Sequence, residues 1–197
     1  MNKLLNKIRQ YENWQKLKSE LIDTSSNTKI KGDIFELITK YYLLTEPIYK
    51  TQIKNVWIHH EVPTEVRKYI NLPNNDEGID LIAQTKDNKY WAIQCKYISD
   101  VNASINEKYI ATFLNLSGNV CKNISVKLTT TTANKKSYKF EKKYDDSVTF
   151  LLGDIWSNLN SYLNNKQVIF HPFIAKPHQS KAISNAYNHF MQTADAQ

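Results

Sequence analysis

The sequence contains few of the residues that build cross-linked or very flexible proteins. Of 197 residues, 4 are glycine, 5 are proline and 2 are cysteine, against 12 tyrosines. Cys95 and Cys121 have neither Cys-x-x-Cys spacing nor a neighbouring histidine cluster, which argues against a disulfide framework and a zinc site. This cysteine usage predicts a reducing, cytoplasmic location. The low glycine content indicates regular elements rather than long flexible loops.

Long apolar runs are also missing. No stretch approaches the roughly 18 apolar residues that a membrane span needs. The N-terminal MNKLLNKIRQ is charged throughout and has no apolar core of a signal peptide. The phosphate-binding pattern G-x-x-x-x-G-K-[ST] does not occur, so no ATPase activity is expected of this chain. We therefore expect neither a membrane partner nor an ATP site.

What is present favours a folded, basic protein. The chain is 41% hydrophobic and 12% aromatic, with a net charge of +7, so it can build one domain with appendages. A positive surface suits acidic partners, of which nucleic acid is the commonest. Charge alone fits a solvated basic surface equally well.

Hydrophobic periodicity predicts alternating helices and strands. The predicted helices cover 3–22, 29–45, 104–118, 135–144 and 154–163, the last with Asp154 as its N-cap. The predicted strands cover 53–60, 78–85, 89–98, 124–132 and 147–153, and 61–77 is predicted to be a loop. The second and third strands flank the turn KDN and should form an antiparallel hairpin. This order predicts an α/β fold, with a mixed central sheet flanked by helices on both faces.

The predicted hairpin carries the residues of greatest chemical interest. Asp80 lies early on one strand, and Gln94 and Lys96 lie on the next, where alternation directs them to one face. The alternating residues Trp91, Ile93 and Cys95 would face the other way, into apolar packing. Burying polar groups unpaired costs several kcal/mol, at roughly 2–7 per group; a metal, a phosphate and water would satisfy them. The alternative is an ordinary hairpin with one wet face.

These residues resemble a known nuclease family. GIDLIA followed by QCK resembles the D-x(n)-Q-x-K variant of the PD-(D/E)xK nucleases, in particular the Mrr-like restriction endonucleases. In KGDIFELITKYY, the residues Gly32, Phe35 and Glu36 resemble that family's G-x-x-F-E signature. The resemblance covers about 29–160 and implies a restriction-endonuclease-like core.

The resemblance implies a role for each site residue. Asp80 would be the essential ligand of Mg²⁺, for which Mn²⁺ can substitute. Gln94, where the family usually has an acid, and the Cys95 backbone carbonyl would complete the coordination. Lys96 would orient or deprotonate the attacking water or stabilise the phosphorane, and Glu36 would act directly or through a metal-bound water. Because Gln94 is neutral, Glu36 gains importance; the alternative is an inactive site.

Other residues are predicted to contact DNA or nucleotide. A basic stretch with interleaved aromatic residues predicts binding to the DNA backbone, although a solvated helix face has the same pattern. The candidate DNA contacts are Lys135, Lys136, Lys139, Lys142, Lys143 and Thr130. Residues 173–190 resemble the [RK]-P-x-Q-x-x-A-I segment that opens superfamily-two helicase motors, where Gln179 would contact the adenine of ATP in a longer protein.

Together these features predict an Mg²⁺-dependent endodeoxyribonuclease within a restriction-modification polypeptide similar to type ISP enzymes. The expected domains are a helical extension (1–28), the nuclease (29–165), and a linker with the start of a helicase (166–197). The expected partners are double-stranded DNA and, in the same polypeptide, helicase, methyltransferase and target-recognition domains. The alternatives are a repair or recombination nuclease of the same fold, and an inactive DNA-binding or assembly module.

Overall fold

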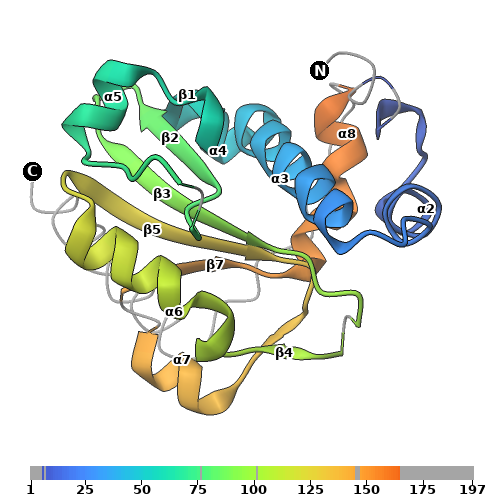
Figure 1. Ribbon diagram of the computed structural model, residues 1–197. Coiled ribbons are helices and arrows are strands. Elements are labelled where there is room, and N and C mark those ends of the chain that lie inside the picture. Colours follow the sequence, from blue (N-terminus) through green and yellow to red (C-terminus); the bar gives the residue numbers. More distant parts are fainter. Residues whose placement is uncertain (1–5, 7, 76, 101, 145–146, 165–197) are drawn as a thin grey trace, which may run out of the picture.

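A five-stranded sheet forms the centre of the protein (Figure 1). The computed structural model describes residues 6, 8–75, 77–100, 102–144 and 147–164. Its strands are β1 (Ile53–Ile58), β2 (Leu81–Thr85), β3 (Tyr90–Lys96), β5 (Ile124–Thr131) and β7 (Thr149–Leu151). They lie in the order β1-β2-β3-β5-β7. The first three are antiparallel and the last three are parallel, so the predicted mixed sheet is confirmed.

Strands β2 and β3 form the predicted hairpin. Leu81 pairs with Ile93 and Gln84 with Tyr90. The turn closes at Asn88, whose φ of 60° is the left-handed conformation that asparagine tolerates better than most residues. The hairpin brings the chain just before β2 beside the end of β3.

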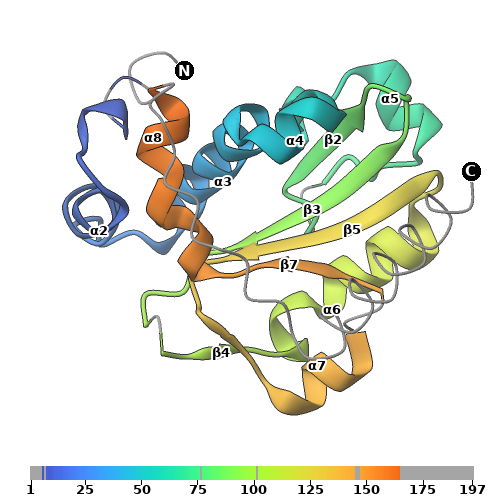
Figure 2. The same ribbon diagram turned by 180° about the vertical axis from the view of Figure 1, so that it is seen from behind.

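One face of the sheet is covered by the long helix α3 (Thr28–Thr45). The helix begins at Asn27, whose side chain accepts hydrogen bonds from the N–H groups of Lys29 and Ile30. The turn η4 (Gly153–Asn158) and helix α8 (Leu159–Leu163) pack beside it (Figure 2). Together they bury the largest hydrophobic core of the described residues.

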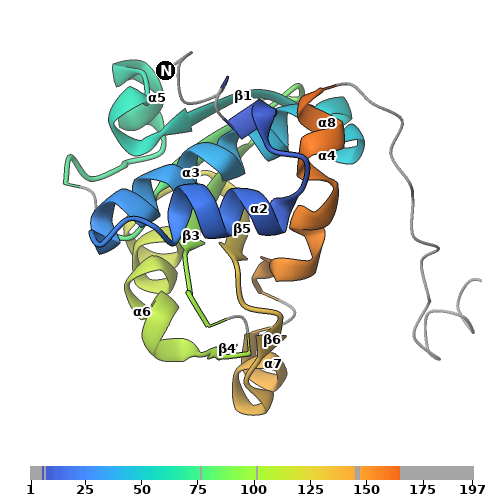
Figure 3. The same cartoon turned by 90° about the vertical axis from the view of Figure 1, so that its right-hand side faces the viewer.

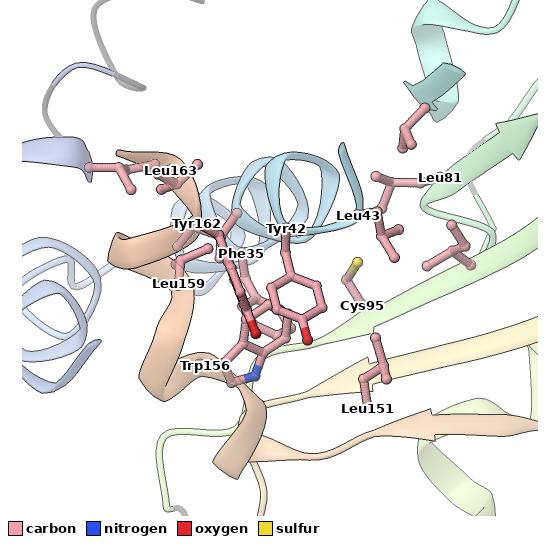
Figure 4. Packing of buried hydrophobic residues seen from close by; sticks show 14 of the residues in the cluster. Phe35, Tyr42, Leu43, Leu81, Cys95, Leu151, Trp156, Leu159, Tyr162 and Leu163 are labelled. Carbon is pink, nitrogen blue, oxygen red and sulfur yellow. The ribbon is translucent and has the colours of Figure 1, made fainter. Parts of the chain in front are cut away.

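An aromatic cluster forms the centre of this core (Figure 4). The fully buried Trp156 ring lies 5.2 Å from the Phe35 ring and 5.1 Å from the Tyr42 ring, centroid to centroid, with both contacts edge-on. The Trp156 indole N–H donates to the Thr131 carbonyl at 3.0 Å. The cluster therefore ties α3 and η4 to strand β5.

The other face is covered by α6 (Glu107–Asn115) and α5 (Thr64–Tyr69), as the side view shows (Figure 3). Phe113 and Ile110 of α6 pack against Ile82 and Ala92 of the hairpin in a second, smaller core. The remaining elements are α2 (Trp14–Leu17), η1 (Lys18–Ile22), α4 (Pro47–Gln52), η2 (His59–Glu61), β4 (Ser104–Ile105), η3 (Leu116–Val120), β6 (Lys135–Lys136) and α7 (Tyr138–Tyr144). No helix within the described ranges is long and apolar enough to cross a membrane.

Several predicted boundaries are wrong. Residues 8–22 do not form one helix, because the chain leaves the helix at residues 11–13 and Asn13 caps a new one, α2. The predicted loop 61–77 contains α5. Asp154 is not an N-cap: the position before η4 is Leu152, which makes no side-chain capping bond. The predicted domain 166–197 and Gln179 lie outside the described residues.

Candidate active site

A cleft of about 550 Å³ opens at the end of β3, between the first turns of α3 and α6. Its lining contains all four predicted catalytic residues, Glu36, Asp80, Gln94 and Lys96, which come from one helix and two neighbouring segments of the sheet. The remaining lining residues are Thr28, Lys29, Gly32, Asp33, Glu77, Gly78, Cys95, Tyr97, Lys108, Tyr109 and Thr112. The four residues therefore line one cleft, and their catalytic and metal-binding roles stay a prediction.

Asp80 is held in place by the backbone of β3. Its own N–H donates to the Ile93 carbonyl at 2.9 Å, extending the hairpin ladder by one residue. Its carboxylate oxygen Oδ2 accepts a hydrogen bond from the Cys95 N–H at 2.5 Å, and the side chain is only 8% exposed. The Asp80 carboxylate thus lies beside the strand segment that carries Gln94 and Lys96.

The backbone favours glycine two residues before this aspartate. Gly78 has a φ of 122°, a conformation that residues with a Cβ rarely adopt. A Cβ at this position would make only ordinary contacts, 3.6 Å from the Gln94 amide nitrogen and 3.5 Å from the Thr112 Cβ, so the backbone conformation and not a lack of space favours glycine. Gly78 therefore allows the chain to turn toward Asp80 while staying close to Gln94.

The two faces of β3 separate as predicted. Trp91, Ile93 and Cys95 point into the core under α3. Gln94, on the other face, is 2% exposed, and its side-chain oxygen Oε1 has no hydrogen-bond partner among the described residues. Lys96 is half-buried and lines the cleft. A buried amide oxygen without a hydrogen bond lowers the stability of the fold, so this atom is a candidate to bind a ligand.

The negative charges of Asp80 and Glu36 both act on the buried Cys95 thiol. Burial raises its pKa well above the ordinary value, and the negative charges of Asp80 and Glu36 raise it further. Both carboxylates are therefore close enough to act on one thiol. The half-buried Glu36 lines the same cleft as Asp80.

The lining suits a hard divalent cation bound by oxygen. Magnesium prefers carboxylate and carbonyl oxygens, and Asp80, Glu36 and the unpartnered Gln94 Oε1 offer these in one cleft. Nowhere in the described ranges do three His, Cys, Asp or Glu side chains cluster as a metal site. A metal here would therefore depend on the Gln94 amide in addition to the two acids.

Thr130 is not available to DNA, so that prediction is wrong. The residue is fully buried, and its hydroxyl lies 3.2 Å from the Thr39 hydroxyl on α3 and 3.4 Å from the Gln94 carbonyl. The register of β5 against β3 explains the error. Thr130 pairs with Cys95, so its side chain lies on the same face of the sheet, toward the core under α3.

The predicted lysine contacts lie outside the cleft. Lys143 bonds Glu107 at 2.9 Å, and the Lys136 ammonium lies 5.1 Å from the centre of the Phe150 ring. The other three, Lys135, Lys139 and Lys142, are exposed. Their role in DNA binding stays a prediction.

Two lysines of the cleft were missed from the sequence. Lys29 lies seven residues before Glu36, a helical spacing that places both on one face of α3. This spacing could have identified Lys29. Lys108 becomes its neighbour only through the packing of α6 across the sheet, for which the sequence has no local signal.

Comparison with known proteins identifies the family to which the chain belongs. A family model described as a restriction endonuclease, of the Mrr catalytic type, matches residues 44–157, which is more than half of the chain. The chain therefore belongs to this restriction endonuclease family, and the predicted Mrr-like relationship is confirmed.

A solved structure shares the fold. The ATP-dependent Type ISP restriction-modification enzyme LlaBIII, bound to DNA, is similar with a TM-score of 0.51 and 22% sequence identity. The match covers 82% of this chain and 10% of that chain, so this protein corresponds to a small part of the larger enzyme. No curated protein matches the chain.

Proposed function

We propose that the protein is a metal-dependent endodeoxyribonuclease domain, the cleavage module of a restriction-modification polypeptide. The observation that carries this proposal is that Asp80, Glu36 and Lys96 line one cleft with Gln94, whose buried side-chain oxygen Oε1 has no hydrogen-bond partner among the described residues. Membership of the restriction endonuclease family supports a nuclease in restriction. It favours this reading over a repair or recombination enzyme of the same fold.

The acids and the amide would hold the metal. Asp80, whose carboxylate is fixed by the Cys95 N–H, is the anionic ligand on the sheet, Gln94 Oε1 the neutral one, and Glu36 the acid from the helix. The Cys95 carbonyl is the proposed further ligand. A bound Mg²⁺ lowers the pKa of water and offsets charge on the phosphoryl oxygens.

Lys96 has the position to act on the reacting groups. Its ammonium shares a strand face with Gln94 and lies at the cleft rather than in an ion pair among the described residues. It donates hydrogen bonds to the attacking water or to a non-bridging phosphate oxygen, and so orients the first and stabilises charge on the second.

The charge of the cleft explains why a cation is needed. Asp33, Glu36, Glu77 and Asp80 line it, together with three lysines. Carboxylates repel a phosphodiester, which carries a negative charge of its own. A divalent cation between the acids and the phosphate converts this repulsion into attraction.

The larger polypeptide is part of the proposal. The type ISP enzyme whose fold the chain shares is about ten times longer than the matched region, at 10% coverage, and residues 173–190 resemble a helicase opening. We therefore place this domain before a helicase motor, with methyltransferase and target-recognition domains in the same polypeptide. ATP would serve the motor and not the nuclease.

The test is cleavage of supercoiled plasmid with Mg²⁺ or with a chelator. We expect nicked or linear product from the wild-type protein only with Mg²⁺, and none from Asp80→Ala. Asp87→Ala is the matched control, because Asp87 lies on the exposed turn of the same hairpin; it should cleave like the wild type.

The assay is repeated on the full-length polypeptide, because cleavage by this domain can depend on the proposed helicase motor. Inactivity of both the wild-type polypeptide and its Asp80→Ala variant, with no Mg²⁺ bound in a calorimetric titration, would contradict the proposal. That outcome would favour the inactive DNA-binding module instead.

A further inference from the structure

Gly32 is a glycine that the fold itself does not require. It lies inside helix α3, where glycine is less favourable than every residue except proline. A Cβ added at this position would meet nothing within 4 Å, and the backbone is not in the left-handed region. Neither packing nor backbone conformation therefore explains the missing side chain.

The open space at Gly32 belongs to the cleft. On α3, Lys29 precedes Gly32 by three residues and Glu36 follows it by four, so the three share one face. Across the cleft, Lys108 stands in the first turn of α6, beside Tyr109, which is 41% exposed. The absence of a side chain thus leaves the surface of α3 bare next to the catalytic acid.

Both lysines are available to an anion. Each is exposed and makes no ion pair within the described part of the chain. They flank the acids of the catalytic cleft from two separate helices. Residues of the N-terminal turns of α3 and α6, where a helix carries partial positive charge, line the same cleft.

We propose that one strand of the DNA backbone passes over α3 in contact with Gly32, while Lys29 and Lys108 bind phosphates on either side of the scissile one. This proposal rests on the proposed nuclease function and describes how the DNA substrate binds in the cleft. Glycine lets the sugar–phosphate chain approach the helix closely enough for the scissile phosphate to reach Asp80 and Lys96. The basic stretch at α7, outside the cleft, is then secondary.

The first test enlarges position 32. Binding of a short fluorescent duplex is measured by anisotropy in the Asp80→Ala background, so that cleavage does not interfere. Gly32→Ala and Gly32→Leu should weaken binding progressively, the second by about tenfold or more. The same substitutions should raise the melting temperature by about 2–4 °C, because they favour the helix.

The second test removes the cations. Lys29→Ala and Lys108→Ala should each reduce the slope of log Kd against log salt by about 0.9, the value for one lost phosphate contact. Lys50→Ala and Lys54→Ala are the controls, because these exposed lysines lie beyond the opposite end of α3, about 25 Å away. They should leave the slope unchanged.

Two outcomes would contradict the proposed position of the DNA backbone on α3. One is unaltered binding by Gly32→Leu; the other is a salt slope that responds to Lys139→Ala and Lys142→Ala but not to the cleft lysines. Failure of the wild-type enzyme to cut, with the binding pattern as expected, would instead contradict only the proposed catalysis.

Discussion

The two faces of strand β3 differ in whether the buried polar groups beside them have hydrogen-bond partners. Toward α3, Cys95 lies in a closed core, and the neighbouring polar groups are paired, as between Thr39 and Thr130. Toward α6, the buried oxygens Gln94 Oε1 and Thr129 Oγ1 have no hydrogen-bond partners in the part of the chain that the structure describes. The first face stabilises the fold, and the second holds polar groups for which a ligand is the natural partner. Ordered by expected change in the free energy of unfolding, four predictions test this contrast.

The largest effect is expected from Trp156→Ala on the closed face. Removing the ring opens a cavity between α3 and β5 and loses the bond to Thr131, so the free energy of unfolding should fall by about 3–5 kcal/mol. Urea denaturation measures this loss. Because Trp156 does not line the cleft, the folded variant should bind Mg²⁺ like the wild type. A loss below about 1 kcal/mol would show that the closed face is not the main source of stability.

The next effect concerns an ion pair that ties α3 to the end of β1. The Lys40 ammonium lies 2.5 Å from the Glu61 carboxylate, which also accepts a bond from the Ile58 N–H. Burial alone would raise the pKa of Glu61, but Lys40 and this N–H more than offset it and hold the pKa below its ordinary 4.5. A lowered folded-state pKa stabilises the protein above the unfolded value, and that stability is lost as the pH falls through the folded value.

We therefore expect Glu61→Gln to lower the free energy of unfolding at neutral pH by about 1–3 kcal/mol. The variant should also lose less stability than the wild type as the pH falls below 4.5. Urea titrations over a pH series measure both. Glu65→Gln, an exposed acid on the neighbouring helix α5, is the control. Equal acid sensitivity of the wild type and Glu61→Gln would refute the role of this pair.

The third prediction separates stability from metal binding on the open face. Gln94→Leu removes the unpartnered amide, so the free energy of unfolding in a chelator should change by less than about 1 kcal/mol. A ligand that binds only the folded state raises its stability, and this rise with Mg²⁺ should be present in the wild type and lost in the variant. Melting curves with and without Mg²⁺ measure it. An equal rise in both proteins would exclude Gln94 as a ligand.

The sequence predicted the parts whose signals are local. Alternation placed Gln94 and Lys96 opposite Cys95, and helical periodicity with its cap gave α3 nearly to the residue, at Thr28–Thr45 against 29–45. Helix α5 was missed because it is only six residues long, and its place depends on burial of Val66. The facing of Thr130 was predicted wrongly because the register of β5 against β3, with Thr130 beside Cys95, is a long-range property.

The smallest effect is expected from Thr129→Val, and its comparison with the same substitution at the adjacent Thr130 gives the sharpest test. Thr129 pairs in register with Gln94 and is fully buried, yet its hydroxyl has no hydrogen-bond partner within the described ranges. Thr129→Val keeps the shape and removes an unsatisfied group, so the free energy of unfolding should stay within about 1 kcal/mol or rise. Thr130→Val leaves the Thr39 hydroxyl without its partner and should cost about 1–3 kcal/mol. If the two variants lose equal stability in urea denaturation, the polar groups on the two faces of the sheet do not differ as the contrast requires.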